Sequence, residues 1–134
     1  MPENTHVLVT GANGFVGSRI VDRLRRDQSV VVVEAVRRAG VGEQIDSNQR
    51  VVGNLDESTD WRVALSGVDA VVHAAARTDA QGAPGVDALA ACRVVNVEVT
   101  RTLALQAAEQ GVRRFVFLSS VKVNGEDTPP GLRF

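Results

Sequence analysis

Three glycines near the amino terminus have the residue type and spacing to bind a phosphate group. Gly11, Gly14 and Gly17 follow an apolar run at Val7–Val9 and open a segment whose apolar residues recur at helical spacing. Glycines at such a turn let the backbone approach a diphosphate, and the free N–H groups of the following helix attract an anion. The pattern therefore predicts a dinucleotide-binding turn. The alternative interpretation is a glycine-rich turn needed only for packing of the strand against the helix.

Two arginines follow a second apolar run, Val30–Val36, and bear on the choice of dinucleotide. Sites that hold NAD usually place a carboxylate at this strand end to bind the ribose hydroxyls, whereas a basic residue suits the 2′-phosphate of NADP. Here the strand ends in Arg37 and Arg38, and Glu34 lies further inside the strand. The charge favours NADP, but an arginine can also stack on adenine while NAD is bound. The choice between NAD and NADP stays open.

The elements that would position these residues alternate along the chain. Besides the two runs above, strands are expected at Arg50–Leu55, Asp69–Ala74 and Arg114–Leu118. Strands and helices joined by short loops require right-handed crossovers, which place helices on both faces of a parallel sheet. We predict an α/β fold with a doubly wound, Rossmann-like sheet of order 3-2-1-4-5. A loop follows the fifth strand, so residues 1–134 are expected to be a dinucleotide-binding domain truncated at that point.

Two further helices are expected between the later strands. The hydroxyls of Ser58 and Thr59 are placed to cap a short helix. That helix would carry Trp61, Ala64 and Leu65 and end at Gly67. A long helix at Ala88–Glu109 would end near Gly111. Its inward stripe is expected to consist of Leu89, Cys92, Asn96, Val99, Leu103 and Ala107.

Composition narrows the function further. The chain has 134 residues, 44% hydrophobic side chains and a net charge of -1, which argues against broad binding to nucleic acid. It lacks an apolar run of the roughly 18 to 20 residues that span a bilayer, so a cytoplasmic protein is expected. Cys92 is the single cysteine, which excludes an internal disulfide, and it is expected to be a small core residue. His73 is expected to pack at the sheet end, with no metal site. No tyrosine is present.

Four segments together resemble one known family. Thr10–Gly17 has the TGxxGxxG pattern, Val72–Ala76 resembles an HxAA segment, and Asn96–Thr100 resembles an NVxGT helix motif. Phe115–Val121 resembles a fifth strand followed by a catalytic serine. In this order, they resemble the extended short-chain dehydrogenases/reductases, and within them the NAD-dependent epimerase/dehydratase group. Ser119–Glu126 is similar to the nucleotide-sugar 4-epimerases of bacterial surface-polysaccharide pathways.

The resemblance implies a site and a reaction. Ser120 would be the catalytic serine, acting with a tyrosine and a lysine four residues apart that this chain lacks. The cofactor would be NAD, or NADP, and the substrate a nucleotide sugar such as a UDP-sugar, epimerised by transient hydride transfer at a sugar carbon. The implied cofactor-binding residues are Gly11, Asn13, Gly14, Phe15, Val16, Gly17, Arg37, Arg38, Asn54, Leu55, Ala74, Ala75, Ala76, Asn96, Leu118 and Ser119.

Several of these residues have alternative roles. Asn54 stands where the family often has an aspartate for the adenine amino group, and an asparagine oxygen can still accept that hydrogen bond. Asn96, if buried, must find partners, so bonding to neighbouring backbone competes with a direct role. The alternative role of Ser120 is to cap the turn that follows it. The long helix is a candidate homodimer surface. The alternative function is a non-catalytic NAD(P)-binding redox sensor, since the chain lacks tyrosine.

Overall fold

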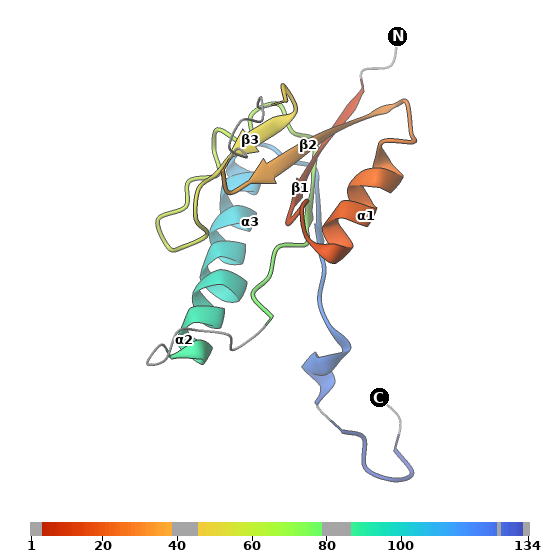
Figure 1. The fold of residues 1–134 in the computed structure, drawn as a ribbon, viewed down its shortest axis with the longest axis vertical. Helices are drawn as coiled ribbons and strands as arrows, with labels where there is room; N and C mark the ends of the chain where they lie inside the picture. Colours follow the sequence, from red (N-terminus) through yellow and green to blue (C-terminus); the bar gives the residue numbers. More distant parts are fainter. Residues whose placement is uncertain (1–3, 39–45, 79–86, 126, 133–134) are drawn as a thin grey trace.

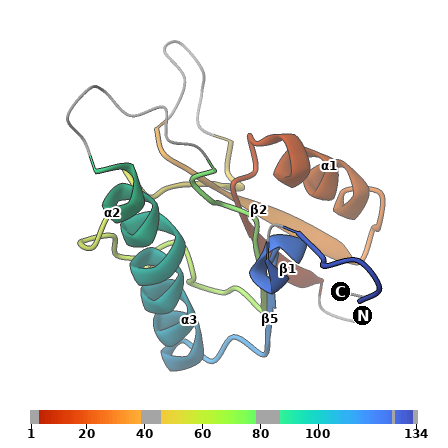
Figure 2. The same cartoon turned by 90° about the horizontal axis from the view of Figure 1, so that it is seen from below.

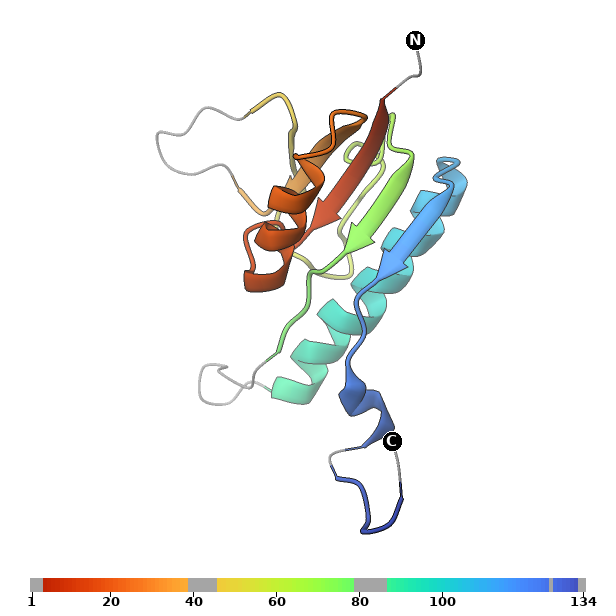
Figure 3. The same cartoon turned by 90° about the vertical axis from the view of Figure 1, so that its right-hand side faces the viewer.

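The computed structural model describes residues 4–38, 46–78, 87–125 and 127–132. Its strands form one parallel sheet with the order β3-β2-β1-β4-β5, which confirms the predicted fold class and strand order (Figure 3). The strands are β1 Thr5–Thr10, β2 Val30–Val36, β3 Gln49–Val51, β4 Ala70–His73 and β5 Arg114–Phe117. The last three are shorter than expected, because ladder pairing stops before the apolar runs do.

Helices cover the two faces of the sheet (Figures 1 and 2). Helix α1, Phe15–Leu24, lies on one face, and α3, Thr100–Glu109, lies on the other. Side chains alternate along each strand, so Val7 and Val9 of β1 pack in the core on the α1 side, whereas Leu8 packs in the core with Leu103 of α3. The glycine turn between β1 and α1 is thereby fixed from both ends.

The long helix contains an irregularity that periodicity does not predict. Helix α2, Ala88–Arg93, continues through a π-helical segment, η1 Val94–Val99, into α3. A π segment rotates the upstream turn relative to the downstream one. The expected stripe is right for Val99, Leu103 and Ala107, which are buried. It is wrong for Leu89, which is 62% exposed, because α2 contributes no buried residue on any face. The predicted end is confirmed: Gly111 has φ +76°, and Val112 N–H donates to Ala107 O at 2.9 Å.

The short helix expected after Thr59 does not form, and neither hydroxyl caps one. Ser58 Oγ donates to Asp56 Oδ1 at 2.6 Å, and Thr59 Oγ1 donates to the Asn54 carbonyl at 3.0 Å. Residues 62–67 form turns instead. The expected apolar residues are nevertheless in the core, because Trp61 N–H donates to Gln106 Oε1 of α3 at 2.7 Å, which anchors the turn against that helix.

Two kinds of feature are absent from the described residues. No helix among them has the length and apolar character needed to cross a membrane. The same residues contain no group of three or more metal-ligating side chains.

Candidate functional site

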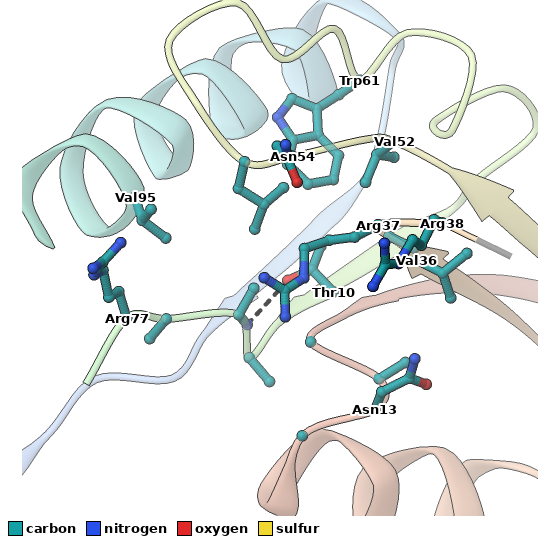
Figure 4. Close-up of a pocket in the computed structure, with 18 of the residues that line it drawn as sticks. Thr10, Asn13, Val36, Arg37, Arg38, Val52, Asn54, Trp61, Arg77 and Val95 are labelled. Atoms are coloured by element: carbon teal, nitrogen blue, oxygen red, sulfur yellow. Dashed lines mark hydrogen bonds between the residues drawn. The ribbon is translucent and has the colours of Figure 1, made fainter. Parts of the chain in front are cut away.

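A pocket of about 1230 Å³ opens at the carboxyl ends of the central strands. Its walls come from the residues that follow β1, β2 and β4, together with parts of the segments around Asn54 and Trp61 (Figure 4). In a parallel sheet of this order, the chain turns away in opposite directions after β1 and β4, and a crevice opens between the two connections. The site thus lies where the fold alone predicts ligand binding.

Two of the three glycines are explained by close packing. Gly11 has φ +69°, and a Cβ there would lie 2.7 Å from the backbone nitrogen of Ala75. A Cβ on Gly17 would lie 1.9 Å from the carbonyl oxygen of Gly11. Both distances are shorter than any van der Waals contact, so these positions need glycine whether or not a ligand binds. The packing interpretation therefore accounts for Gly11 and Gly17.

Gly14 differs from the other two glycines. It has the extended conformation φ -78° and ψ 169°, which any residue can adopt, and a Cβ would meet only the Gly11 oxygen, at 3.1 Å. Gly14 lines the pocket directly before α1. The absence of a side chain here keeps the end of the helix accessible from the pocket.

The amino terminus of α1 has the properties of an anion site. No side chain caps it, and its first turn contains no acidic residue. The first N–H groups of a helix have no intrahelical acceptor, and the helix dipole adds a partial positive charge at this end. An acidic cap would have competed with a bound phosphate. Phe15 and Val16, predicted as binding residues, are exposed (87% and 49%) and do not line the pocket, whereas their backbone N–H groups belong to this helix end.

The charge of the pocket is one-sided. Arg37, Arg38 and Arg77 line it, and the described part of the lining includes no aspartate or glutamate. Glu34, the acid of β2, is buried and forms an ion pair with Arg25 at the end of α1. It is therefore held away from the pocket lining by its own partner. A pocket with three arginines and without acids attracts a ligand that carries several negative charges.

A buried histidine joins the strands beneath the pocket. His73 Nδ1 lies 2.6 Å from Thr10 Oγ1, and its Nε2 lies 2.8 Å from Thr100 Oγ1. Thr10 Oγ1 also accepts the Ala75 N–H at 3.2 Å, so its own proton is free to go to His73 (Figure 4). Burial lowers the pKa of His73 to about 4, which keeps the ring neutral at physiological pH. The prediction of a packing residue at the sheet end is confirmed.

Asn96 bonds to backbone, as one of the two alternatives predicted. Its Oδ1 accepts the Arg77 N–H, and its Nδ2 donates to the Arg77 carbonyl, both at 2.8 Å. The amide thereby fixes the segment that leaves β4 and passes along the pocket. Asn96 itself is not a lining residue, whereas its neighbour Val95 is.

The structure brings most of the sixteen expected cofactor residues together. Those that line the pocket are Gly11, Asn13, Gly14, Arg37, Arg38, Asn54, Leu55, Ala74, Ala75 and Ala76. Leu118, Ser119 and Ser120 lie outside the lining, on the segment that runs away from the sheet after β5 (Figure 1). Ser120 Oγ accepts the Lys122 N–H at 3.2 Å and caps the short 3-10 helix η2, Val121–Asn124. Its catalytic role stays a prediction.

Sequence reasoning missed four notable lining residues. Thr10 belonged to the recognised motif but had no role assigned to it. Arg77 follows the three alanines at the end of β4, so its charge and place were visible signals. Trp61 lines the pocket because of its packing in the core, and Val95 lines it from the π-helical segment. No local sequence pattern predicts either position.

Comparison with known proteins agrees with this geometry. Residues 7–133 match the model of the NAD dependent epimerase/dehydratase family. The chain belongs to this family. It is 40% identical over 134 residues to a UDP-glucose 4-epimerase of Vibrio cholerae, covering 100% of this chain and 40% of the relative.

Two further proteins are similar to this chain. A 3-beta-hydroxysteroid dehydrogenase of Mycolicibacterium neoaurum is 33% identical over 138 residues, covering 92% of this epimerase/dehydratase chain and 36% of the relative. A short-chain dehydrogenase/reductase superfamily protein from Agrobacterium tumefaciens, solved with bound NAD, is 38% identical with a TM-score of 0.73. The match covers 95% of this chain and 36% of that structure. The chain thus spans about two fifths of the length of the curated relatives it matches.

Proposed function

We propose that this chain is the dinucleotide-binding part of an NAD-dependent nucleotide-sugar epimerase or dehydratase, similar in chemistry to UDP-glucose 4-epimerase. One observation carries the proposal: the uncapped amino terminus of α1 meets, at Gly14, a pocket lined by arginines and, within the described residues, by no acid. The diphosphate of a dinucleotide matches both features. The relative from Vibrio cholerae supports a UDP-sugar as substrate.

The residues of the pocket fit a dinucleotide from one end to the other. The backbone N–H groups that follow Gly14 would hold the diphosphate, because they point out of α1 without an acceptor. Arg37 and Asn54, at the other wall, would hold the adenosine end through stacking and an amide hydrogen bond. When bound, the nicotinamide would supply the hydride acceptor and donor for oxidation and return at a sugar carbon.

The reacting residues form a separate part of the proposal. Ser120, by its match to the family motif, would hydrogen-bond the reacting sugar hydroxyl. It is exposed and keeps its hydroxyl oxygen engaged as an acceptor for Lys122 N–H, which leaves its proton free to donate. Because the chain has no tyrosine, we expect the 134-residue protein to bind the cofactor without epimerising UDP-glucose. Turnover of UDP-glucose by this chain, lost in Ser120→Ala, would contradict that expectation.

Binding can be tested with the protein's own fluorescence. Trp61 is the single tryptophan, lines the pocket, and has no tyrosine background, so its emission reports ligand binding. Titration with NAD should give a saturable change in the wild-type chain. Gly14→Ala, which places a methyl group at the helix entrance, should weaken binding about tenfold. Ser18→Ala is the matched control, since Ser18 lies in the same helical turn outside the pocket lining.

An unchanged NAD affinity in a folded Gly14→Ala variant would refute the placement of the diphosphate.

The same titrations decide between NAD and NADP as the cofactor. If Arg37 or Arg38 contacts a 2′-phosphate, NADP binds more tightly than NAD, and added salt narrows the difference by screening. Equal affinities at low salt would assign the arginines to adenine stacking or to solvent.

The proposal also includes the assembly and the cellular location expected from the sequence. A homodimer formed through the long helix is supported by exposed apolar side chains along it, at Leu89, Val97 and Leu105. The cytoplasmic location stays a prediction from composition. Light scattering of the purified chain measures the mass of the assembly directly.

A further inference from the structure

Arg77 presents an unsatisfied donor at the wall of the pocket. Its Nε is buried without a hydrogen-bond partner among the described residues. A buried N–H group left without an acceptor is unfavourable, so such atoms usually meet a ligand or an ordered water. Arg77 lines the pocket together with Val95, on the side opposite Arg38 (Figure 4).

The backbone of Arg77 is held more firmly than its side chain. Asn96 bonds to both its N–H and its carbonyl at 2.8 Å. Asn96 belongs to the π-helical segment η1, and short π segments within α-helices are frequent at functional sites. Both bonds go to the backbone of Arg77, and its Nε has no acceptor among the described residues. The arrangement fixes the backbone from which this cation extends into the pocket wall.

The sheet order sets the place of Arg77 along a bound ligand. The strands β2, β1 and β4 are neighbours in the sheet, with β1 in the middle. Arg37 and Arg38 follow β2, the glycine turn follows β1, and Arg77 lies beyond the end of β4. Gly11 in the middle touches the backbone of Ala75 on the Arg77 side. A ligand lying across these strand ends meets the two arginines first, then the turn, and then Arg77.

We propose that the guanidinium of Arg77 binds a phosphate oxygen of the dinucleotide beyond its adenosine monophosphate part, and that Asn96 is the positioning residue that holds Arg77 in place. The inference rests on the proposed function, because it takes a dinucleotide as the ligand. Arginine suits this contact, since its planar group donates two parallel hydrogen bonds to phosphate. Lysine offers the same charge without that geometry.

The experiment compares NAD with AMP, which lacks the second phosphate, by Trp61 fluorescence and calorimetry. Arg77→Gln should weaken NAD binding about tenfold and AMP binding less than twofold, and Arg77→Lys should fall between wild type and Arg77→Gln. Arg101→Gln is the matched control, because it removes the same charge from an exposed position on α3 outside the pocket lining. Circular dichroism confirms that each variant is folded.

The positioning role of Asn96 is tested by comparing single and double variants of Asn96 and Arg77. Asn96→Ala should weaken NAD binding without any change of charge and leave AMP binding intact. If Asn96 acts through Arg77, the double variant with Arg77→Gln binds NAD no more weakly than Arg77→Gln alone. Additive losses would show that Asn96 does not work through Arg77.

Three results would overturn the inference. The first is an NAD affinity of Arg77→Gln equal to that of the Arg101→Gln control. The second is an equal loss of affinity for NAD and for AMP in Arg77→Gln. The third is a loss of affinity for UDP with the NAD affinity unchanged, which would assign Arg77 to the substrate. If Gly14→Ala weakens NAD binding while Arg77→Gln does not, the proposed function stands and this inference fails. A wild-type chain that binds no NAD refutes both.

Discussion

Mild acid should destabilise this protein through one buried side chain. His73 Nδ1 is bonded to the Thr10 hydroxyl and Nε2 to the Thr100 hydroxyl. With the Thr10 proton directed to Nδ1, His73 donates from Nε2, which is the pattern of a neutral ring. Its ring also stacks on Phe117, with centroids 5.9 Å apart. A proton added at Nδ1 would face the Thr10 hydroxyl as a second donor, in a site where the ring is 1% exposed.

The size and the pH range of the effect follow from the shifted pKa. In the unfolded chain the histidine takes up its proton near its ordinary pKa of 6.5, whereas in the folded protein it does so at about 4. Between these values the unfolded state binds more protons, so stability falls as the pH falls through this range. At 1.36 kcal/mol per pKa unit, the loss from pH 7 to below pH 4 is about 3 kcal/mol. A domain of this size has about 5–15 kcal/mol of stability in total.

Urea unfolding at pH 7, 5.5 and 4, followed by circular dichroism, measures the effect. His73→Gln should be less stable than wild type at pH 7 and should lose much less stability on acidification. His6→Gln is the control, since His6 is the other histidine and its side chain is 44% exposed. The stability contributed by the exposed Asp60 carboxylate, whose pKa is lowered from 3.8 to about 2, is lost only near and below its ordinary pKa, and equally in wild type and His73→Gln. Equal losses in wild type and His73→Gln would refute the reasoning.

Three further outcomes are expected. Gly17→Ala should destabilise the fold by about 3 kcal/mol in urea unfolding, because its methyl group would overlap the Gly11 carbonyl, 1.9 Å away. Arg25→Ala should lower the free energy of unfolding by about 1–2 kcal/mol, because it leaves the buried Glu34 carboxylate unpaired. The effect is smaller than for a fully buried ion pair, because the arginine side chain is half-exposed. Stability should recover in the double variant with Glu34→Gln. The chain should self-associate through the exposed edge of β5, and Val116→Lys, at a side chain that is 52% exposed, should lower the mass measured by light scattering. Unchanged unfolding midpoints in Gly17→Ala or Arg25→Ala would contradict the first two expectations, and an unchanged mass in Val116→Lys would contradict the third.

The sheet could be predicted from sequence because its signals are local. The β-branched run Val30–Val36 is buried in its last five residues, as a strand covered on both faces requires. Gly111 takes the positive φ expected at a helix end. Of the site, the glycine turn, the two arginines after β2 and the alanines after β4 were predictable, because each directly follows a strand.

The errors arose where distant contacts decided the structure. Trp61 was expected in a helix, but its N–H bonds to Gln106, 45 residues away, and this contact exists only in the folded chain. Leu89 was expected inside, but α2 contributes no residue to the core, and Leu89 is 62% exposed. Arg77 owes its fixed backbone to Asn96, 19 residues along the chain. No period of 2 or 3.6 residues encodes these contacts.

The packing around Gly11 affects what binding requires of the chain. The Gly11 carbonyl accepts the Gly14 N–H at 2.9 Å, Gly17 presses against the same carbonyl, and the other side of Gly11 touches Ala75. The turn is packed between β4 and α1, so the fold sets its conformation. Fixing a residue's backbone costs about 1–2 kcal/mol of conformational entropy, and here that entropy is lost during folding. A ligand therefore meets a preorganised turn, and its binding free energy is not reduced by ordering it.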